Sequence, residues 1–210
     1  MLRILETTMG EEPAFTDPLI AYFRDYFPLN NIERNEIGKR FMERKIRRRQ
    51  FILQEGDICN HFTFIISGCF KMYAVTEDAK EHIIQFSIEN EWISDLSSLY
   101  SRSPSKLFIE ALEPSIILQI KHEDLLNLFS SYHKFDRNFR IIIERVYIKL
   151  QERMLENISS SAQHRYEQFV KNNPDLARRL PGTQIASYLG ITPEFLSKIR
   201  KAIVGKRQKP

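Results

Sequence analysis

The stretch from Gly182 to Lys201 constrains the fold most, because it is typical of two short helices joined by a tight turn. Apolar residues up to Leu189 share one helical face, and Gly190 follows immediately. Glycine is favoured where a helix ends in a left-handed residue, because it has no Cβ to clash. A second helix is then predicted to start two residues later, since Thr192 can cap it and Pro193 suits its first position.

The second helix has an apolar side and a polar, basic side. Phe195, Leu196 and Ile199 are expected to face inward, and the other side carries acidic, hydroxyl and basic residues. Two short helices at this spacing form the helix-turn-helix arrangement of DNA-binding proteins. A bare helical pair can also serve packing alone. The small Ala186, the glycine turn and the capped second helix coincide here, and together they favour DNA binding.

Positive charge is concentrated around this stretch. The whole chain has a formal net charge of +4, but residues 159–210 hold ten Lys or Arg against three acids, whereas residues 1–158 are net negative. A phosphate-binding surface needs such an excess, because neutralising phosphates releases counterions and supplies much of the affinity for nucleic acid.

The rest of the composition indicates where in the cell the protein is expected and which disulfide and metal sites it lacks. The 210-residue chain has no apolar run long enough for a membrane span. Its first residues lack the pattern of a signal peptide, so a cytoplasmic location is expected. The two cysteines, Cys59 and Cys69, form neither a disulfide framework nor a metal or iron–sulfur ligand set, and we expect both to be small buried hydrophobes. No cofactor and no metal are expected.

Between Phe51 and about Ile120 the pattern changes to short strands. β-branched and aromatic runs alternate with turns such as Gly56-Asp57 and Ser67-Gly68. Such spacing predicts an antiparallel β-sandwich or barrel. A small barrel or roll has an interior that can hold one ligand.

A long helix is predicted from Phe135 to about Asn157, with apolar residues recurring at threes and fours. This stripe either packs on the β-domain or forms a dimer seam, and its length favours at least partial use as a seam. The serine run from Ser159 to Ser161 ends the helix and marks a domain boundary. The expected divisions are residues 1–132, 133–158 and 159–210. The candidate dimer residues are Phe139, Ile142, Ile143, Val146, Leu150 and Met154.

This order of parts resembles the CRP/FNR (catabolite-activator type) family of bacterial transcription regulators. The residues that carry the resemblance are Gln54-Glu55-Gly56-Asp57, Phe64-Ile65-Ile66-Ser67-Gly68, Trp92-Ile93-Ser94-Asp95 and the terminal helix-turn-helix. The resemblance covers nearly the whole chain.

The resemblance implies an α+β fold: an N-terminal cyclic-nucleotide-binding-like β-roll, or jelly-roll, a long dimerisation helix and a C-terminal winged helix-turn-helix domain. It also implies a homodimer that binds a pseudo-palindromic site on double-stranded DNA, with half-sites about one turn, ~34 Å, apart as in the catabolite activator itself. RNA polymerase is a further candidate partner.

Within the second helix of the motif, the family's base-reading positions fall on Pro193, Glu194 and Lys198. Glu194 can accept from cytosine and Lys198 can donate to guanine, although Glu194 can equally serve as a helix cap. Pro193 stands where arginine is frequent, which removes one base contact. The phosphate candidates are Thr183, Thr192, Ser197, Arg200 and Lys201.

The effector site departs from the family pattern. Cyclic-nucleotide binders in the family carry a glutamate for the ribose and an arginine for the cyclic phosphate. The matching positions here are Ser94, Asp95, Leu96, Ser105 and Lys106. Aspartate is shorter than glutamate, and lysine lacks the bidentate fork of arginine. Tight binding of cyclic AMP is therefore not expected, and the effector is unknown.

Two other classes of protein are alternatives. A small-molecule or cyclic-nucleotide sensor acting through protein contacts would use the helix-turn-helix for packing only. A cupin-type enzyme would bind metal in the roll through a His-x-His pair, but His61-Phe62-Thr63 lacks the second ligand and His82 stands alone. The chain is therefore expected to be a regulator and not an enzyme.

Overall fold

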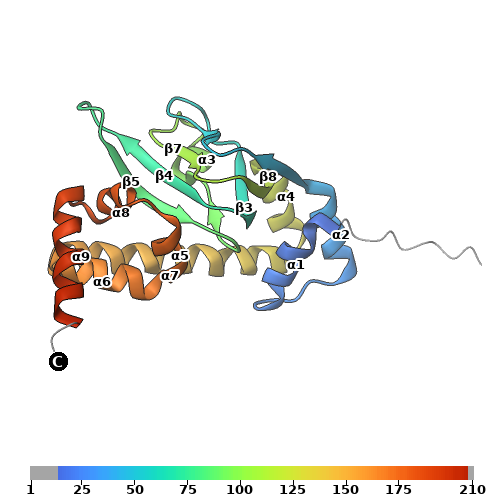
Figure 1. Cartoon of the computed structure of the whole chain (residues 1–210). Helices are drawn as coiled ribbons and strands as arrows, with labels where there is room; N and C mark the ends of the chain where they lie inside the picture. Colours follow the sequence, from blue (N-terminus) through green and yellow to red (C-terminus); the bar gives the residue numbers. More distant parts are fainter. Residues whose placement is uncertain (1–13, 208–210) are drawn as a thin grey trace, which may run out of the picture.

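The computed structural model describes residues 14–207 and places side chains up to residue 203. Residues 1–13 and 208–210, which the expected terminal domains include, lie outside the described residues. The chain begins with helical elements and continues into strands (Figure 1). The helices before, within and directly after the strand region are η1 (Ala14–Thr16), α1 (Asp17–Arg24), α2 (Asn31–Arg40), α3 (Leu96–Ser101) and α4 (His122–Ser131).

The strands form a roll of two four-stranded sheets. One sheet has the order β1-β8-β3-β6 and the other has the order β2-β7-β4-β5, with every pairing antiparallel. The predicted jelly-roll is therefore confirmed. The strands are β1 (Phe41–Ile46), β2 (Phe51–Leu53), β3 (His61–Ser67), β4 (Phe70–Val75), β5 (Glu81–Ser87), β6 (Trp92–Ile93), β7 (Phe108–Ala111) and β8 (Ser115–Lys121).

Strand β1 starts the roll ten residues earlier than the sequence pattern indicated. Only its end residues, Phe41 and Ile46, are buried, and the four residues between them are exposed. The strand lies at the edge of its sheet beside β8. Charged side chains are common on such edges because they discourage pairing with other chains. The usual alternation of buried and exposed residues is therefore absent, and the basic character of the segment concealed the strand.

An aromatic cluster joins the roll to the helices that cover it. The Trp92 ring stacks on Phe62 at 4.7 Å between centroids and meets Phe139 edge-on at 5.1 Å. Phe23 of α1 packs against both Trp92 and Phe139. Aromatic pairs in these geometries contribute beyond their buried area. The cluster therefore fixes α1 and the start of the long helix against the β1-β8-β3-β6 sheet.

The long helix α5 (His133–Ser159) has 27 residues and spans about 40 Å. It runs beneath the roll and on to the C-terminal helices (Figure 1). Its first half is buried through Phe135, Phe139 and Ile142, whereas Leu150, Met154 and neighbouring apolar residues in its second half are exposed.

Four helices follow α5 and form the C-terminal domain: α6 (Ala162–Asn172), α7 (Pro174–Arg179), α8 (Gly182–Leu189) and α9 (Pro193–Arg207). The α+β class and the helix-turn-helix of α8 and α9 are as predicted. The wing implied by the resemblance has no strands within residues 160–207, where every regular element is helical. None of the helices between residues 14 and 207 combines the length and apolar character needed to cross a membrane.

The turn between β3 and β4 gives a test of the roll's packing. Gly68 has φ of 108°, and a Cβ built on it would lie 2.0 Å from Ser115 Oγ and 2.9 Å from Ser115 Cα. Gly56 also has positive φ, 89°, but nothing lies within 4 Å of such a Cβ. Gly68→Ala should lower the free energy of unfolding by about 1–3 kcal/mol more than Gly56→Ala, because it adds overpacking to backbone strain. Urea denaturation of both variants measures the difference, and equal losses would contradict it.

Candidate nucleic-acid interface

The turn of the helix-turn-helix is built by glycine geometry. Gly190 has φ of 67° and ends α8 in the left-handed region. The N–H of Ile191 then donates to the carbonyl of Ala186 at 3.0 Å, which satisfies one of the free carbonyls at the helix end. No atom outside its chain neighbours lies within 4 Å of a Cβ built on Gly190, so the backbone conformation is what requires glycine here.

Helix α9 begins with the cap that the sequence predicted. Thr192 Oγ1 accepts from the N–H of Phe195 at 3.2 Å. Hydrogen bonds from its own backbone N–H and from Thr192 hold the pKa of Glu194 below its ordinary value, so the carboxylate is charged at the positive end of the helix dipole. Glu194 is exposed, so its carboxylate is available to a duplex as well.

The outer face of α9 gathers most of the predicted DNA-binding residues. Glu194, Ser197, Lys198 and Lys201 follow the i, i+3, i+4, i+7 spacing of one helical face, and all four are exposed. Thr183 is exposed at the start of α8, and Thr192 and Pro193 are exposed at the start of α9. Helix α9 lies at one end of the molecule (Figure 1). A polar, basic helix face is thus presented to solvent.

Two residues of α9 differ from expectation. Arg200 is half-buried, its Nε donates to the hydroxyl of Tyr166 at 3.1 Å, and its guanidinium lies 5.5 Å from that ring. It braces α9 on α6 in this structure. Phe195, expected on the inward side, is 47% exposed, so the inward side is formed by Leu196 and Ile199. Phe195 lies in the first turn of the helix.

The helix-turn-helix shares a hydrophobic core with the roll. Ile185 and Ala186 of α8 are fully buried in a cluster that also contains Ile83 and Phe86 of β5. At the same contact, Ser187 Oγ donates to the carbonyl of Glu81 at 2.6 Å. Helix α8 therefore rests on β5, while the outer face of α9 remains free.

Two arginines tie the long helix to the C-terminal domain. Arg153 of α5 donates to the carbonyls of Ile83, Ile84 and Tyr188, and its guanidinium lies 3.9 Å from the centre of the Tyr188 ring. Arg165 of α6 donates to carbonyls at the ends of α5 and α8. The sequence does not indicate these contacts, because nothing in its pattern shows which carbonyls a fold will leave free.

Arg179 of α7 joins the C-terminal domain to two turns of the roll. It donates to both oxygens of Glu89, at 2.8 and 3.1 Å, and also to Glu113. Glu89 in turn accepts from the N–H of Gly68 at 2.7 Å. Burial opposes the charge on Glu89, but the hydrogen bonds from Arg179 and from the backbone outweigh it and lower the pKa of that carboxyl. The contact is thus fully ionised at neutral pH.

The residues predicted for an effector pocket mostly make contacts within the protein. Asp95 caps α3 by accepting from the N–H of Ser98 at 3.2 Å, and its other oxygen accepts from Ser105 Oγ at 2.7 Å. Asp95 and Ser105 are 6% and 3% exposed. Lys106 is exposed, Leu96 packs beside the core, and Ser94 alone of the five borders a cavity in the roll.

The predicted dimer stripe divides into two parts. Phe139 and Ile142 are 3% and 2% exposed, since they pack in the core of the protomer, and they are not available to a second copy. Leu150 and Met154 are 54% and 64% exposed, and Ile143 and Val146 are half-buried. The sequence prediction did not include four further exposed apolar residues of the same helix: Tyr147, Ile148, Leu155 and Ile158.

The two cysteines do not form a disulfide with each other. Cys59 and Cys69 are free and buried, as predicted, and burial raises the pKa of the Cys69 thiol to about 12. No cluster of three or more His, Cys, Asp or Glu side chains suited to a metal ion occurs within the part of the chain that the structure describes.

Comparison with known proteins finds bacterial regulatory proteins that are similar to this chain. Residues 43–132 match the cyclic nucleotide-binding domain family. The anaerobic regulatory protein of Pasteurella multocida is 26% identical over 199 residues, which cover 87% of this chain and 69% of the relative.

Solved structures share the fold. FixK2 from Bradyrhizobium japonicum superposes with a TM-score of 0.69 at 17% identity, covering 79% of this chain and 85% of that one. A transcriptional regulator of the Crp/Fnr family from Eubacterium rectale gives a TM-score of 0.70 at 13% identity, covering 89% and 88%.

The bridge made by Arg179 can be tested against its sequence neighbour. Arg179→Gln should loosen the docking of α7 and α8 and lower the free energy of unfolding by about 1 kcal/mol, a small value because the pair is partly exposed. Arg178→Gln is the matched control, since within residues 14–207 the only ion pair of Arg178 is with Asp175 of its own helix. Faster amide hydrogen exchange in α8 for the first variant alone is the expected result. Equal exchange in both variants would remove Arg179 from this role.

Proposed function

We propose that this chain, which belongs to the CRP/FNR family of transcription regulators, works as a homodimer that binds a pseudo-palindromic DNA site through the outer face of α9. The observation that carries the proposal is the exposed row of Glu194, Ser197, Lys198 and Lys201 on a capped helix at the end of the molecule. The concentration of positive charge in residues 159–210 supports it, since phosphate contacts supply the non-specific part of the affinity.

Within this face the residues take different roles. Lys198 is proposed to read guanine and Glu194 to accept from cytosine, while Thr183, Thr192, Ser197 and Lys201 contact phosphates. Arg200 contacts a phosphate only if it releases Tyr166. A cytoplasmic location, contact with RNA polymerase and the absence of catalytic activity complete the proposal. The functional divisions remain residues 1–132, 133–158 and 159–210.

The second half of α5 is proposed to be the dimer seam. Ile143, Tyr147, Leu150 and Met154 are spaced by four, three and four residues, the heptad rhythm of a coiled coil. Three of them are more than half exposed in the single chain. A second copy is the partner that fits, because two such stripes are self-complementary about a two-fold axis. The same axis would set the two α9 helices against successive major grooves.

Selection of bound sequences from a random duplex pool tests the function as a whole. Recovery of a two-fold-symmetric motif supports DNA reading and the dimer together. A protein that retains no duplex at any salt concentration would instead be a sensor that acts through protein contacts.

Lys198 and Lys201 separate base reading from phosphate binding. Lys198→Ala should relax the preference at one position of each half-site, at a cost of about 1–3 kcal/mol for the preferred base. Lys201→Ala should weaken all sequences alike and reduce the salt slope by about 1. Fluorescence anisotropy with the selected duplex and its single-base variants, over a salt series, measures both. The assignment fails if Lys198→Ala weakens every duplex equally.

Met154 tests the seam without disturbing the protomer, because the side chain is 64% exposed in the single chain. Met154→Glu should weaken dimerisation at least about tenfold, since two carboxylates would be buried across the axis. Glu152→Lys is the control: residue 152 is exposed two positions away, on the opposite side of the helix. Sedimentation analysis gives the dimer dissociation constant. An unchanged constant for Met154→Glu would move the seam elsewhere.

A further inference from the structure

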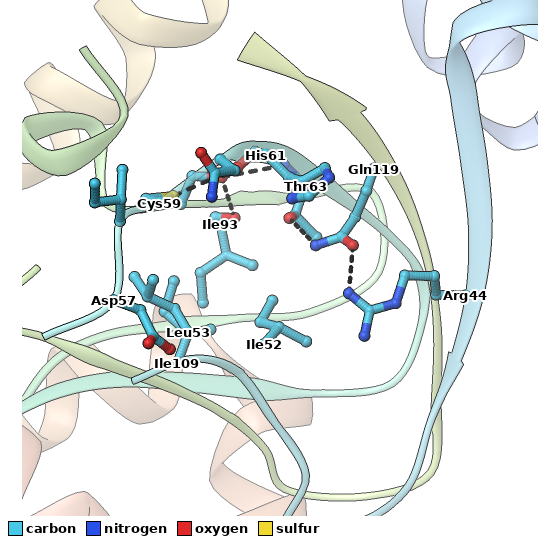
Figure 2. Close-up of a pocket in the computed structure, with 13 residues that line it drawn as sticks. Arg44, Ile52, Leu53, Asp57, Cys59, His61, Thr63, Ile93, Ile109 and Gln119 are labelled. Carbon is cyan, nitrogen blue, oxygen red and sulfur yellow. Dashed lines mark hydrogen bonds between the residues drawn. The ribbon is translucent and has the colours of Figure 1, made fainter. Parts of the chain in front are cut away.

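A cavity of about 320 Å³ lies between the two sheets of the roll, at the end formed by β1 and β2. Figure 2 shows its lining, with Ile52, Leu53, Ile93 and Ile109 as apolar walls. The cavity is separate from the buried Asp95–Ser105 pair, neither of which lines it. Its size is at the lower end for small-molecule sites, and apolar walls with a few polar groups are their usual composition.

Three polar side chains form a chain of hydrogen bonds along one side of the cavity (Figure 2). Arg44 Nη1 donates to Gln119 Oε1 at 2.6 Å, and Gln119 Nε2 donates to Thr63 Oγ1 at 3.0 Å. Arginine can only donate, and this fixes which end of the Gln119 amide faces it. Thr63 therefore accepts from the amide, and its own hydroxyl hydrogen is left to be donated. Thr63 and Gln119 are 2% and 3% exposed, so this arrangement is built into the interior.

The guanidinium of Arg44 reaches from β1 toward the cavity (Figure 2). Within the described residues no Asp or Glu is in ion-pair contact with it, and Gln119 is its one hydrogen-bond acceptor there. His61 adds no second charge at neutral pH, because burial, Arg44 and Lys121 lower the pKa of its ring. The cavity thus offers one cation and a free hydroxyl donor, both suited to an anionic acceptor.

An acid marks the opposite side of the same cavity. Figure 2 shows Asp57 across the cavity from Arg44, beyond the apolar walls. Its Oδ2 accepts from the N–H of Gln54 at 3.3 Å. A ligand that carried negative charge at both ends would therefore meet repulsion at the Asp57 side. The arrangement favours a single anionic group with an apolar body.

We propose that this cavity binds a small organic monocarboxylate, with its carboxylate on Arg44 and Thr63 and its apolar tail between the isoleucine and leucine side chains. The inference deepens the proposed function and rests on the roll being an effector-binding domain, for which it names the class of effector. The planar guanidinium matches a carboxylate in a bidentate contact. The tail gains from burial against the apolar walls.

Isothermal titration of the full chain with defined probes tests the binding. Hexanoate should bind saturably, one per chain, and at least about tenfold more tightly than hexanamide, which lacks the charge. Butyrate should bind more weakly than hexanoate, by about fourfold for each lost methylene. Adipate, with a carboxylate at both ends, should bind at least about tenfold more weakly than hexanoate, because of Asp57.

Arg44→Gln should abolish the preference for hexanoate over hexanamide. The residue is exposed, so the variant is expected to fold, which thermal melting checks. Arg47→Gln is the matched control. It removes an exposed arginine three residues after Arg44, and Arg47 does not line the cavity. Equal binding of hexanoate and hexanamide, no saturable binding of either acid, or unchanged binding by Arg44→Gln would each overturn the proposal.

The DNA function is measured separately, by anisotropy of the selected duplex with and without hexanoate. A chain that binds hexanoate but no duplex supports the cavity and contradicts the proposed function. A chain that binds the duplex but no monocarboxylate supports the proposed function and contradicts the assignment of the cavity.

Discussion

The packing of the first half of α5 against the roll determines how the rest of the molecule is arranged. Phe135, Phe139 and Ile142 bury their side chains on the sheet that contains β3 and β6, around Trp92. Because a helix is stiff, fixing this half also fixes the direction of the second half, whose apolar residues Leu150 and Met154 are exposed. Both the proposed dimer seam and the support for the helix-turn-helix depend on that one contact.

Much of the architecture could be predicted from the sequence because it depends on local signals. The glycine at 190, the threonine cap at 192 and the turn glycines of the roll each impose a backbone conformation, and the structure has them. Strand β1 was missed because it lies at the edge of its sheet, where charged residues stand in place of the usual alternation of apolar and polar residues. The stripe of α5 could not be divided in advance, since periodicity shows which residues share a face and not which part of that face the roll covers.

The sites show the same limit. Exposure of the α9 residues follows from helical spacing, so it could be predicted, whereas the contact of Arg200 with Tyr166 joins residues 34 positions apart and could not. The resemblance predicted an effector role for Asp95 and Ser105, but the aspartate hydrogen-bonds within the protein and becomes part of the framework. The polar residues that remain available in the roll come from β1, β3 and β8, which a motif in one segment of sequence cannot reveal.

The contacts of Arg153 would affect how the helix-turn-helix is oriented in a two-fold symmetric dimer. Its guanidinium belongs to α5, yet its partners are carbonyls of a roll strand and of the first helix of the motif. In a two-fold assembly this planar group on each side would then help to set the tilt of each recognition helix relative to the axis. Lysine, with a point charge and no fork, could not fix that tilt in the same way. The spacing between the two halves of the DNA operator would thus depend in part on Arg153, a residue that does not contact the DNA.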